Sequence, residues 1–325
     1  MKAIVFTQYG PPEVLKIVEV DKPVPKENEV LIKVHAAVVS SADCTFRRGE
    51  PYFARLYFGI LKPRTTILGT EFAGQIEAVG KDVKNFTIGD KVIGAPGAAF
   101  GAHAEYIAIA EDGALALMPS NLSYAEAAGV CEGGNTALPF LRDEAKITSG
   151  QKILINGASG SVGSSAVQLA KHFGAEVTGV CSTPNLDFVK SLGADHVIDY
   201  TSVDFTRGSY SYDFVFDTVG KSSYCKCKNI LKQSGVYLAT VFTFTHLTWM
   251  LWTSIIGSKK VIFAATGLRP AYKQAKDMTF LKELAESGVI KPTISKTYKP
   301  HEIAEAHRLI ETGHKRSNVV LSFDE

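Results

Sequence analysis

The chain has 325 residues, 46% of them hydrophobic, and its 35 Lys and Arg residues against 33 Asp and Glu residues give a net charge of +2. A near-neutral chain without a basic run is not typical of proteins that bind nucleic acid, so no such partner is expected. Five scattered cysteines without a Cys-x-x-Cys pair indicate reduced intracellular thiols, and the length favours two domains.

The first 120 residues or so are rich in predicted strands and turns. Met1 to Phe6 has the pattern of a first strand and lacks the long apolar segment and cleavage site of a signal peptide, which favours a cytoplasmic location. Apolar and polar residues alternate at 30–34 and 72–79, as is typical of half-buried strands in an antiparallel barrel or sandwich. Ser123 and Glu126 then form a capping-box pattern that predicts the start of a helix.

From there to about residue 265 strands and helices alternate, which predicts a parallel sheet. An apolar strand at 153–155 leads into a glycine turn and a helix that ends at Gly174, and a second strand follows at 176–181. Gly160 and Gly163 are expected where a Cβ atom would not fit, and the N–H groups that open the helix would bind a pyrophosphate. The turn therefore predicts a dinucleotide site, although Ala158 replaces the first glycine of the usual pattern. The predicted contacts are Ala158, Ser159, Gly160, Ser161, Val162 and Gly163.

The residue after the second strand distinguishes NADH from NADPH. An NAD site places Asp or Glu there to bind the ribose 2′-hydroxyl, whereas this chain has Ser182. Ser182 and Asn185 can donate hydrogen bonds to a 2′-phosphate, so NADPH is the favoured cofactor. A cation is expected as well, and the sequence does not choose among Lys190, Arg207, Lys315 and Arg316.

An uncharged, aromatic-rich segment covers Val241 to Ile256. It is shorter than the roughly 18 to 20 residues that a membrane-spanning helix needs. A buried helix or a subunit contact is favoured, with contact to a membrane surface as the alternative. Further along, the spacing predicts a helix over 271–286, a short helix over 301–310 and a last strand over 319–323, which we expect to return to the first domain.

Several motifs follow one another in a characteristic order: Tyr9-Gly10-Pro11-Pro12, Val39-Ser40-Ser41-Ala42-Asp43, Leu68-Gly69-Thr70-Glu71, Gly89-Asp90-Lys91-Val92 and Leu192-Gly193-Ala194-Asp195. Together they resemble the zinc-independent quinone oxidoreductase branch of the medium-chain dehydrogenase/reductase superfamily. The resemblance implies an α/β chain with a GroES-like, β-rich catalytic domain at 1–121 and 266–325 and a Rossmann domain, a doubly wound parallel sheet, at 122–265. It also implies NADPH as hydride donor and a homodimer formed through the nucleotide domain.

Zinc-dependent relatives place a cysteine ligand where this chain has Ser40 and a His-Glu pair where it has Thr70 and Glu71. No metal site is therefore expected. Without a metal to stabilise charge on the substrate oxygen, electron-poor acceptors are favoured, namely quinones and α,β-unsaturated carbonyls. Two alternatives stay open: a non-catalytic NADPH-binding protein, and a membrane-associated reductase of lipid-soluble acceptors.

The resemblance also suggests catalytic residues. Ser40 takes the place of a polar residue that faces the nicotinamide, while capping of a turn is an equally common role for a serine at the end of a strand. Tyr52 is the nearest phenol that could donate to a substrate oxygen, although tyrosines in such sequences more often pack. Asp43 is expected to pair with Arg47 or Arg48 and so stiffen its loop.

Further cofactor contacts are implied by the same resemblance. Thr136 matches a threonine that contacts the cofactor, and Tyr200 matches an aromatic residue beside the adenosine phosphate. Val219 follows the end of a strand, which is where cofactors bind in doubly wound sheets. Asp217, just before it, is expected to fix the turn rather than to do chemistry.

Overall fold

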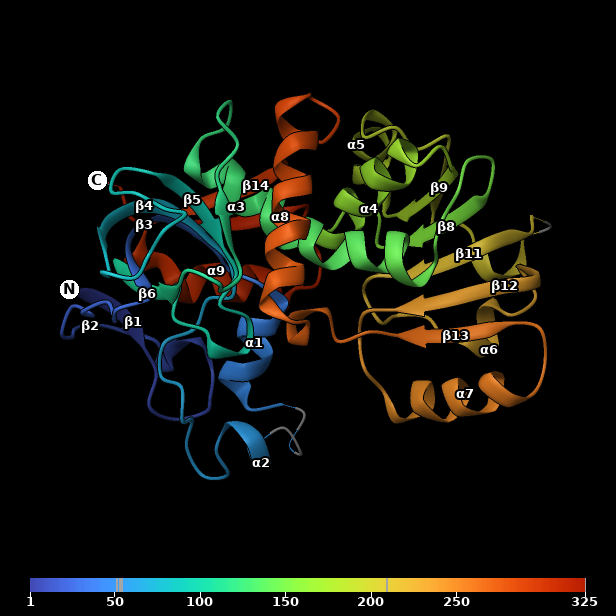
Figure 1. Ribbon diagram of the computed structural model, residues 1–325. Coiled ribbons are helices and arrows are strands. Elements are labelled where there is room, and N and C mark those ends of the chain that lie inside the picture. Colours follow the sequence, from blue (N-terminus) through green and yellow to red (C-terminus); the bar gives the residue numbers. More distant parts are fainter. Residues whose placement is uncertain (51, 53–54, 209, 325) are drawn as a thin grey trace. The chain divides into compact units, whose positions relative to one another are not determined.

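The computed structural model describes residues 1–50, 52, 55–208 and 210–324, and the chain divides into two units (Figure 1). Unit 1 contains Met1–Glu132 and Gly267–Glu325, and unit 2 contains Gly133–Thr266. The first division falls inside α3 (Tyr124–Leu138), which begins with the predicted capping box: the Ser123 N–H donates to Glu126 Oε2 at 2.9 Å. The domain boundaries expected after residues 121 and 265 stay predictions.

A seven-stranded sheet forms the frame of unit 1, in the order β14, β15, β3, β4, β5, β7, with β6 paired to β3. Its neighbours are antiparallel except for the parallel pair β14 and β15. The strands are β3 (Glu29–Val38), β4 (Phe72–Val79), β5 (Lys91–Gly94), β6 (Tyr106–Ala110), β7 (Leu115–Leu117), β14 (Ile294–Tyr298) and β15 (Asn318–Ser322). A separate two-stranded sheet joins β1 (Lys2–Val5) to β2 (Lys16–Glu19).

Strand β3 is the centre of unit 1, because it pairs with β4 along most of its length and with β6 and β15 along two separate stretches. The pairing of Val320 with Val38 confirms that the last strand returns to the first part of the chain. The helices of unit 1 are α1 (Ser41–Arg48), α2 (Arg55–Phe58), α8 (Ala271–Glu286) and α9 (Ile303–Glu311). Ile4, Leu68 and Ile310 belong to the apolar cluster between α9 and the strands, which fixes both ends of the chain in one core.

Unit 2 is built on a parallel sheet of six strands in the order β10, β9, β8, β11, β12, β13. The strands are β8 (Lys152–Asn156), β9 (Glu176–Cys181), β10 (His196–Asp199), β11 (Tyr212–Asp217), β12 (Leu231–Ala239) and β13 (Lys260–Phe263). Strand order reverses between β8 and β11, and doubly wound sheets bind ligands beyond the carboxyl ends of the strands at such a point. The predicted Rossmann topology is confirmed.

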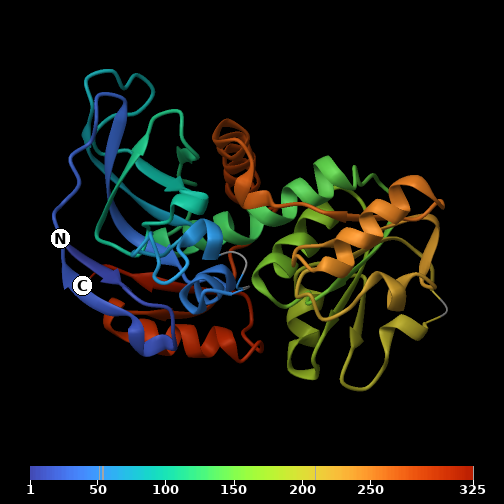
Figure 2. The ribbon, with the colours of Figure 1, turned by 90° about the horizontal axis from the view of Figure 1, so that it is seen from below.

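The helices of unit 2 are α4 (Ser161–His172), α5 (Leu186–Ser191), α6 (Tyr224–Cys227) and α7 (Phe244–Ile255). Figures 1 and 2 show α4 beside β8 and β9, and α7 beside β13. Ile153, Leu154 and Ile155 of β8 are all fully buried. A continuous apolar run of this kind is what a parallel strand covered on both faces requires.

Within the segment Val241 to Ile256, residues Phe244–Ile255 form the predicted helix. The expectation of a buried helix is wrong, whereas the alternative of a subunit contact stays a prediction. His246 and Thr253 of α7 are buried, whereas the side chains of Phe244 and Ile255 are 69% and 83% exposed. A single helix packed on an edge strand covers that strand with one side only, so its other side faces outward. Within the described residues, no helix is both long and apolar enough to cross a bilayer.

Candidate functional site

The glycine turn after β8 brings backbone atoms very close together. Gly157 has a φ of +82°, and a Cβ atom on it would lie 2.5 Å from Val219 Cγ1. A Cβ on Gly163 would lie 2.1 Å from the Gly157 carbonyl oxygen, as predicted for that position. For Gly160 the prediction is wrong: its φ is −75° and the nearest atom would be 3.4 Å away. Gly157, missed by the sequence analysis, takes that role, and its position three residues before Gly160 was the available signal.

Helix α4 begins directly after this turn. Its N-cap is Gly160, which has no side chain with which to accept a hydrogen bond from the first turn. The first N–H groups of a helix have no partner within the helix, and the helix dipole places partial positive charge there. The first turn of α4 therefore presents backbone donors to an anion such as a pyrophosphate. The N–H groups of Ala158 and Gly160, by contrast, already donate to the carbonyl oxygens of Val180 and Gly157.

Helix α3 packs against the same turn. A Cβ atom on Gly133 would lie 2.3 Å from Ser165 Oγ and 2.6 Å from the Ser161 carbonyl oxygen, so α3 and α4 approach closely there. Thr136 follows Gly133 by three residues and thus lies on the same side of α3. Thr136 is half-buried, and its contact with the cofactor stays a prediction.

The carboxyl end of β9 carries the residues predicted for the 2′-phosphate. Asn185 Nδ2 donates to Ser182 Oγ at 3.1 Å, so the two polar side chains form one small cluster. The Tyr200 N–H donates to the Cys181 carbonyl oxygen at 3.1 Å, which places Tyr200 beside Ser182. The three predicted contacts Ser182, Asn185 and Tyr200 thus lie together at one edge of the sheet.

A carboxylate that the sequence analysis missed lies at this edge. Asp199 ends β10 and is paired with Cys181 of β9, and its Oδ2 accepts a hydrogen bond from Thr183 Oγ1 at 2.5 Å. Hydrogen bonds from Thr183 and then Thr201 hold the pKa of Asp199 below its ordinary value, so it is charged at neutral pH. The sequence analysis considered only the residue that follows β9, so it did not find this carboxylate, which the neighbouring strand β10 supplies.

Asp217, at the end of β11, is fully buried and organises the next turn. It accepts hydrogen bonds from Asn156 Nδ2, the Gly220 N–H and the Tyr237 hydroxyl, each at 3.0 Å. The Val219 N–H also donates to it, at 3.2 Å. These hydrogen bonds confirm that Asp217 fixes the turn. The fixed turn holds Val219 against Gly157.

Taken together, the carboxyl edge of the unit 2 sheet fits a dinucleotide. The crowding at Gly157 and Gly163 brings backbone to the place where a pyrophosphate would lie, and α4 supplies the N–H donors. Ser182, Asn185 and Tyr200 lie together beyond the end of β9, where the adenosine end of the cofactor is predicted. Of the four candidate cations, Lys190 follows this cluster on α5, and Arg207 pairs with Asp204 at 3.2 Å.

In unit 1, Ser40 is the N-cap of α1. Its hydroxyl donates to Asp43 Oδ2 at 2.8 Å and accepts from the Asp43 N–H at 3.3 Å. Asp43 Oδ1 accepts from the Gly69 N–H at 2.9 Å, which ties α1 to the segment that continues into Thr70 and Glu71. The positions at which zinc-dependent relatives have ligands are thus joined through Asp43.

Glu71 and Glu132 form a pair of enclosed carboxyl groups beside Asp43. Burial raises the pKa of Glu71 to about 8, with a further contribution from Glu132. Burial also raises the pKa of Glu132, although Lys315 opposes the shift. Among the described residues, Glu132 Oε2 has no hydrogen-bond partner. The pair therefore holds at least one proton near neutral pH, which the sequence pattern did not predict.

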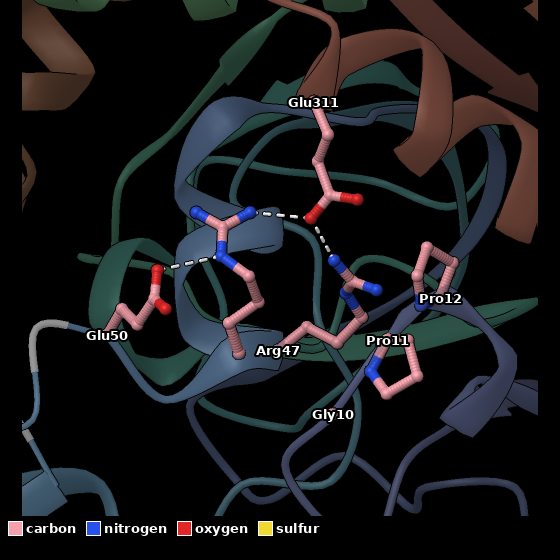
Figure 3. Close-up of a pocket in the computed structure, with 7 residues that line it drawn as sticks. Gly10, Pro11, Pro12, Arg47, Glu50 and Glu311 are labelled. Carbon is pink, nitrogen blue, oxygen red and sulfur yellow. Dashed lines mark hydrogen bonds and ion pairs between the residues drawn. The ribbon is translucent and has the colours of Figure 1, made fainter.

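A pocket of about 380 Å³ lies elsewhere in unit 1 (Figure 3). Arg47 and Arg48 both donate to Glu311 there, and Arg48 Nε donates to Glu50 at 2.8 Å. The expected pairing of Asp43 with one of these arginines is wrong, because Asp43 is taken up by Ser40 and Gly69. The two positive and two negative charges pair with one another, so the pocket has no net charge with which to select a ligand.

Tyr52 precedes α2, and its flanking residues Pro51 and Phe53 lie outside the described part of the chain. Its side chain is 72% exposed, and the Arg55 guanidinium lies 4.8 Å from the centre of its ring. The phenol is therefore not held by packing, and no acceptor in the described structure fixes its direction.

Two protein families match this chain: residues 26–120 match the alcohol dehydrogenase GroES-like domain and residues 192–321 a family described as zinc-binding dehydrogenase. A 2-methylene-furan-3-one reductase of Solanum lycopersicum is 34% identical, over 99% of this chain and 79% of that protein. An NADPH-dependent alkenal/one oxidoreductase of Arabidopsis thaliana is 33% identical over the same shares.

Solved structures agree with these matches. The quinone oxidoreductase of Coxiella burnetii has a TM-score of 0.89 and 32% identity, covering 100% of this chain and 99% of its own. The Escherichia coli quinone oxidoreductase in complex with NADPH has a TM-score of 0.86 and 27% identity, covering 99% of this chain and all of its own. The chain belongs to the zinc-independent, quinone oxidoreductase-like branch of the medium-chain dehydrogenase/reductase superfamily.

Proposed function

We propose that this protein is an NADPH-dependent reductase that transfers a hydride to quinones or α,β-unsaturated carbonyls without zinc. The observation that carries the proposal is the dinucleotide-shaped edge of the unit 2 sheet, where Gly157, Gly163 and the start of α4 meet. The relatives named above, among them an alkenal/one oxidoreductase and a quinone oxidoreductase, support the choice of acceptor.

In this proposal the protein binds and orients, and the cofactor supplies the reactive hydride from its nicotinamide. The N–H groups of α4 and the turn from Ala158 to Gly163 hold the pyrophosphate. Ser182, Asn185 and Tyr200 hold the adenosine end, and Thr136 and Val219 contact the cofactor near the glycine turn. A quinone or an enone spreads the charge that develops on it, so it needs less stabilisation from the protein than an isolated ketone.

Ser40 and Tyr52 remain the proposed contacts to the acceptor. The Ser40 hydroxyl donates its proton to Asp43, so donation to a substrate would require that hydrogen bond to break. Ser40→Ala should lower kcat by about 10-fold or more if the hydroxyl acts on the substrate, and should lower only stability if it acts as a cap. Tyr52→Phe removes only the exposed hydroxyl and leaves the ring over Arg55, so a change in kcat would assign that hydroxyl to the acceptor.

Reduction of an enone also requires a proton, and Glu71 is the proposed source. Its raised pKa, about 8, keeps the carboxyl protonated at neutral pH. If Glu71 donates, kcat with an enone should fall as pH rises through about 8, and Glu71→Gln should remove that dependence. A quinone substrate in the same variant serves as the control, because its reduced form can take a proton directly from water.

The deciding experiment is NADPH oxidation by the purified protein across quinones, enals, enones and simple ketones. We expect turnover with the first three classes and little with the ketones. The activity should survive a chelator, and elemental analysis should find less than one zinc per chain. Tight NADPH binding without turnover of any acceptor would instead identify a non-catalytic NADPH-binding protein. Loss of activity together with one bound zinc would contradict the metal-free mechanism.

We further propose that the protein is cytoplasmic and forms a homodimer through unit 2. Strand β13 lies at the edge of the parallel sheet, so one of its sides can pair with a second copy. Sedimentation velocity across a concentration series would measure the mass of the assembly. A monomer at all concentrations would contradict the dimer.

A further inference from the structure

The outer side of α7 forms a continuous apolar surface, which we call the α7 face: Phe244, Leu247, Leu251, Trp252 and Ile255. Phe244, Leu247, Leu251 and Ile255 are spaced by three or four residues, so they fall on one side of the helix. Leu251 and Trp252 are 61% and 57% exposed. The opposite side is packed, since Trp249 and Met250 join the core of unit 2 and Thr253 is buried. Contiguous apolar surfaces of this kind mark interaction sites in soluble proteins.

The charge around α7 is of one sign. Between residues 218 and 266 the chain contains no Asp or Glu and six lysines, at positions 221, 226, 228, 232, 259 and 260. Since the whole chain carries +2 and this segment +6, the rest of the chain carries −4. The surplus of positive charge is thus concentrated in the part of the sequence that forms α6, β12, α7 and β13.

Three of these lysines flank α7 in space; we call them the α7 lysines: Lys221, Lys228 and Lys259. Helix α6 lies beside α7, because the rings of Tyr224 and Trp249 are 5.2 Å apart, and Lys228 follows α6 directly. Lys259 donates to the Lys228 carbonyl oxygen at the other end of α7. A Cβ on Gly220 would lie 2.8 Å from Val241 Cβ, which places Lys221 near the start of the helix.

The α7 lysines have no acidic partner to neutralise them. Lys221 and Lys228 are exposed and Lys259 is half-buried, and the ion pairs formed by the described residues do not include them. By contrast, Lys232 of the same segment pairs with Asp213 at 2.7 Å. The surface therefore combines an exposed apolar stripe with unpaired positive charges at both of its ends.

This surface is poorly suited to binding a second copy of this chain. A two-fold symmetric interface centred on the α7 face would place the same patch of both subunits together. It would bring the lysines of both copies near each other, and residues 218–266 offer no carboxylate to pair with them. The head groups of anionic phospholipids supply the missing negative charge, and their acyl chains accept the apolar stripe.

We propose that α7 docks this protein on the surface of an anionic phospholipid membrane, with Phe244, Leu251, Trp252 and Ile255 at the level of the head groups and upper acyl chains. The helix lies along the surface and does not cross the bilayer. Docking would place the protein where lipid-soluble acceptors are found. The inference does not depend on the proposed reductase activity, because lipid binding can be measured without cofactor or acceptor.

The chain provides its own probe for this contact. Its two tryptophans, Trp249 and Trp252, are both on α7, so the intrinsic tryptophan fluorescence of the full chain reports on this helix alone. Vesicles of phosphatidylcholine with phosphatidylserine should shift the emission to shorter wavelength, and brominated acyl chains should quench it. Phosphatidylcholine vesicles alone should have little effect. Raising the salt concentration should weaken binding, since salt screens the lysine charges.

Two sets of variants separate the apolar from the electrostatic contribution. Leu251→Glu with Ile255→Glu should weaken co-sedimentation with anionic vesicles at least 10-fold, and Lys228→Glu with Lys259→Glu should weaken it several-fold and abolish the salt dependence. Leu61→Glu is the matched control, because Leu61 is an equally exposed apolar residue of unit 1, at 91%. Circular dichroism and NADPH affinity should stay unchanged in all of them.

Equal binding to neutral and anionic vesicles, or no change in tryptophan emission with either, would overturn the proposal. The proposal would also be overturned if the native protein did not bind vesicles and the double variant Leu251→Glu with Ile255→Glu converted a dimer into monomers. The α7 face would then be a subunit interface. Activity with soluble quinones in a protein that does not bind vesicles would leave the proposed function intact and reject only the docking surface.

Discussion

Both units enclose carboxyl groups, but the number of hydrogen bonds that these groups accept differs between the units. In unit 2, Asp217 is surrounded by donors: two side chains and three backbone N–H groups give it hydrogen bonds of 3.0 to 3.2 Å. In unit 1, Glu71 accepts a hydrogen bond from Thr70 and faces Glu132, whose Oε2 has no partner among the described residues. One carboxylate is fully satisfied, and the other two are not.

The difference separates a structural acid from a titrating one. A carboxylate that accepts several hydrogen bonds is stabilised in its charged form and fixes the groups that donate to it. Enclosed carboxyl groups that have few donors and repel each other hold a proton instead, which is the direction of the raised pKa values of Glu71 and Glu132. The edge in unit 2 is therefore suited to binding in a fixed geometry, and the pair in unit 1 to exchanging a proton.

The largest expected effect comes from removing the satisfied carboxylate. Asp217→Ala leaves the Tyr237 hydroxyl, Asn156 and the turn without their acceptor, so it should reduce the free energy of unfolding by about 3 kcal/mol or more. Chemical denaturation would measure the change. Asp187→Ala on exposed α5 is the control and should change stability by less than about 0.5 kcal/mol. A loss no greater than in the control would show that the hydrogen bonds of Asp217 are dispensable.

The crowded turn can be tested with a matched pair of glycine substitutions. Gly163→Ala pushes a Cβ into the Gly157 carbonyl oxygen and displaces the turn, so NADPH should bind about 100-fold more weakly. Gly160→Ala adds the same atom three residues earlier, at an ordinary contact distance and an ordinary φ, and should change affinity less than about 3-fold. Titration of nicotinamide fluorescence gives both dissociation constants. Similar affinities in the two variants would show that the crowding does not shape the site.

The unsatisfied pair should make stability depend on pH. Folding raises the pKa of Glu71 from its ordinary value of 4.5 to about 8, so the folded protein binds this proton more tightly than the unfolded chain does. Its stabilising effect is complete below about pH 4.5 and is lost as pH rises towards 8, by at most about 1.4 kcal/mol per pH unit. Denaturation of the native protein and Glu71→Gln between pH 6 and 8 should show a loss of about 2 kcal/mol in the native protein only.

An exposed carboxylate provides the opposite sign as a control. The pKa of Glu286 is lowered to about 2, chiefly by Lys282, so any stability from this pair is present above about pH 4.5 and is lost on acidification. Glu286→Gln should therefore leave the profile between pH 5 and 8 unchanged. If Glu71→Gln also left it unchanged, the enclosed pair would not be the titrating group.

The smallest effect concerns the carboxylate at the adenosine edge. Asp199→Asn removes a negative charge next to the Ser182 cluster and should tighten NADPH binding about 3- to 10-fold, with little change for NADH. Ser182→Asp places a new charge in the same cluster and should have the reverse effect on NADPH. The dissociation constants of NADPH and NADH, measured for the native protein and both variants, test these expectations. An NADPH affinity indifferent to both substitutions would mean that the 2′-phosphate lies elsewhere.

The sequence pattern was sufficient to predict those elements whose structure is determined by residues close together along the chain. The strand, turn and helix from 152 to 172, the capping box at Ser123 and the helix over 271–286 were all predicted, because strand burial, caps and helical spacing depend on residues only a few positions apart. The alternation of strands and helices likewise predicted the parallel sheet, and the family motifs implied NADPH as the cofactor.

Contacts between distant segments could be decided only by the tertiary structure. Asp199 reaches the end of β9 because β10 pairs with that strand, and Glu132 meets Glu71 because α3 packs near β4. Gly157 is crowded by Val219, which is 62 residues away in sequence. The outer side of α7 is exposed because β13 is the last strand of the sheet and one helix covers it with one side only. Composition shows that a residue is charged, small or apolar, whereas its partners and its burial are properties of the packed chain.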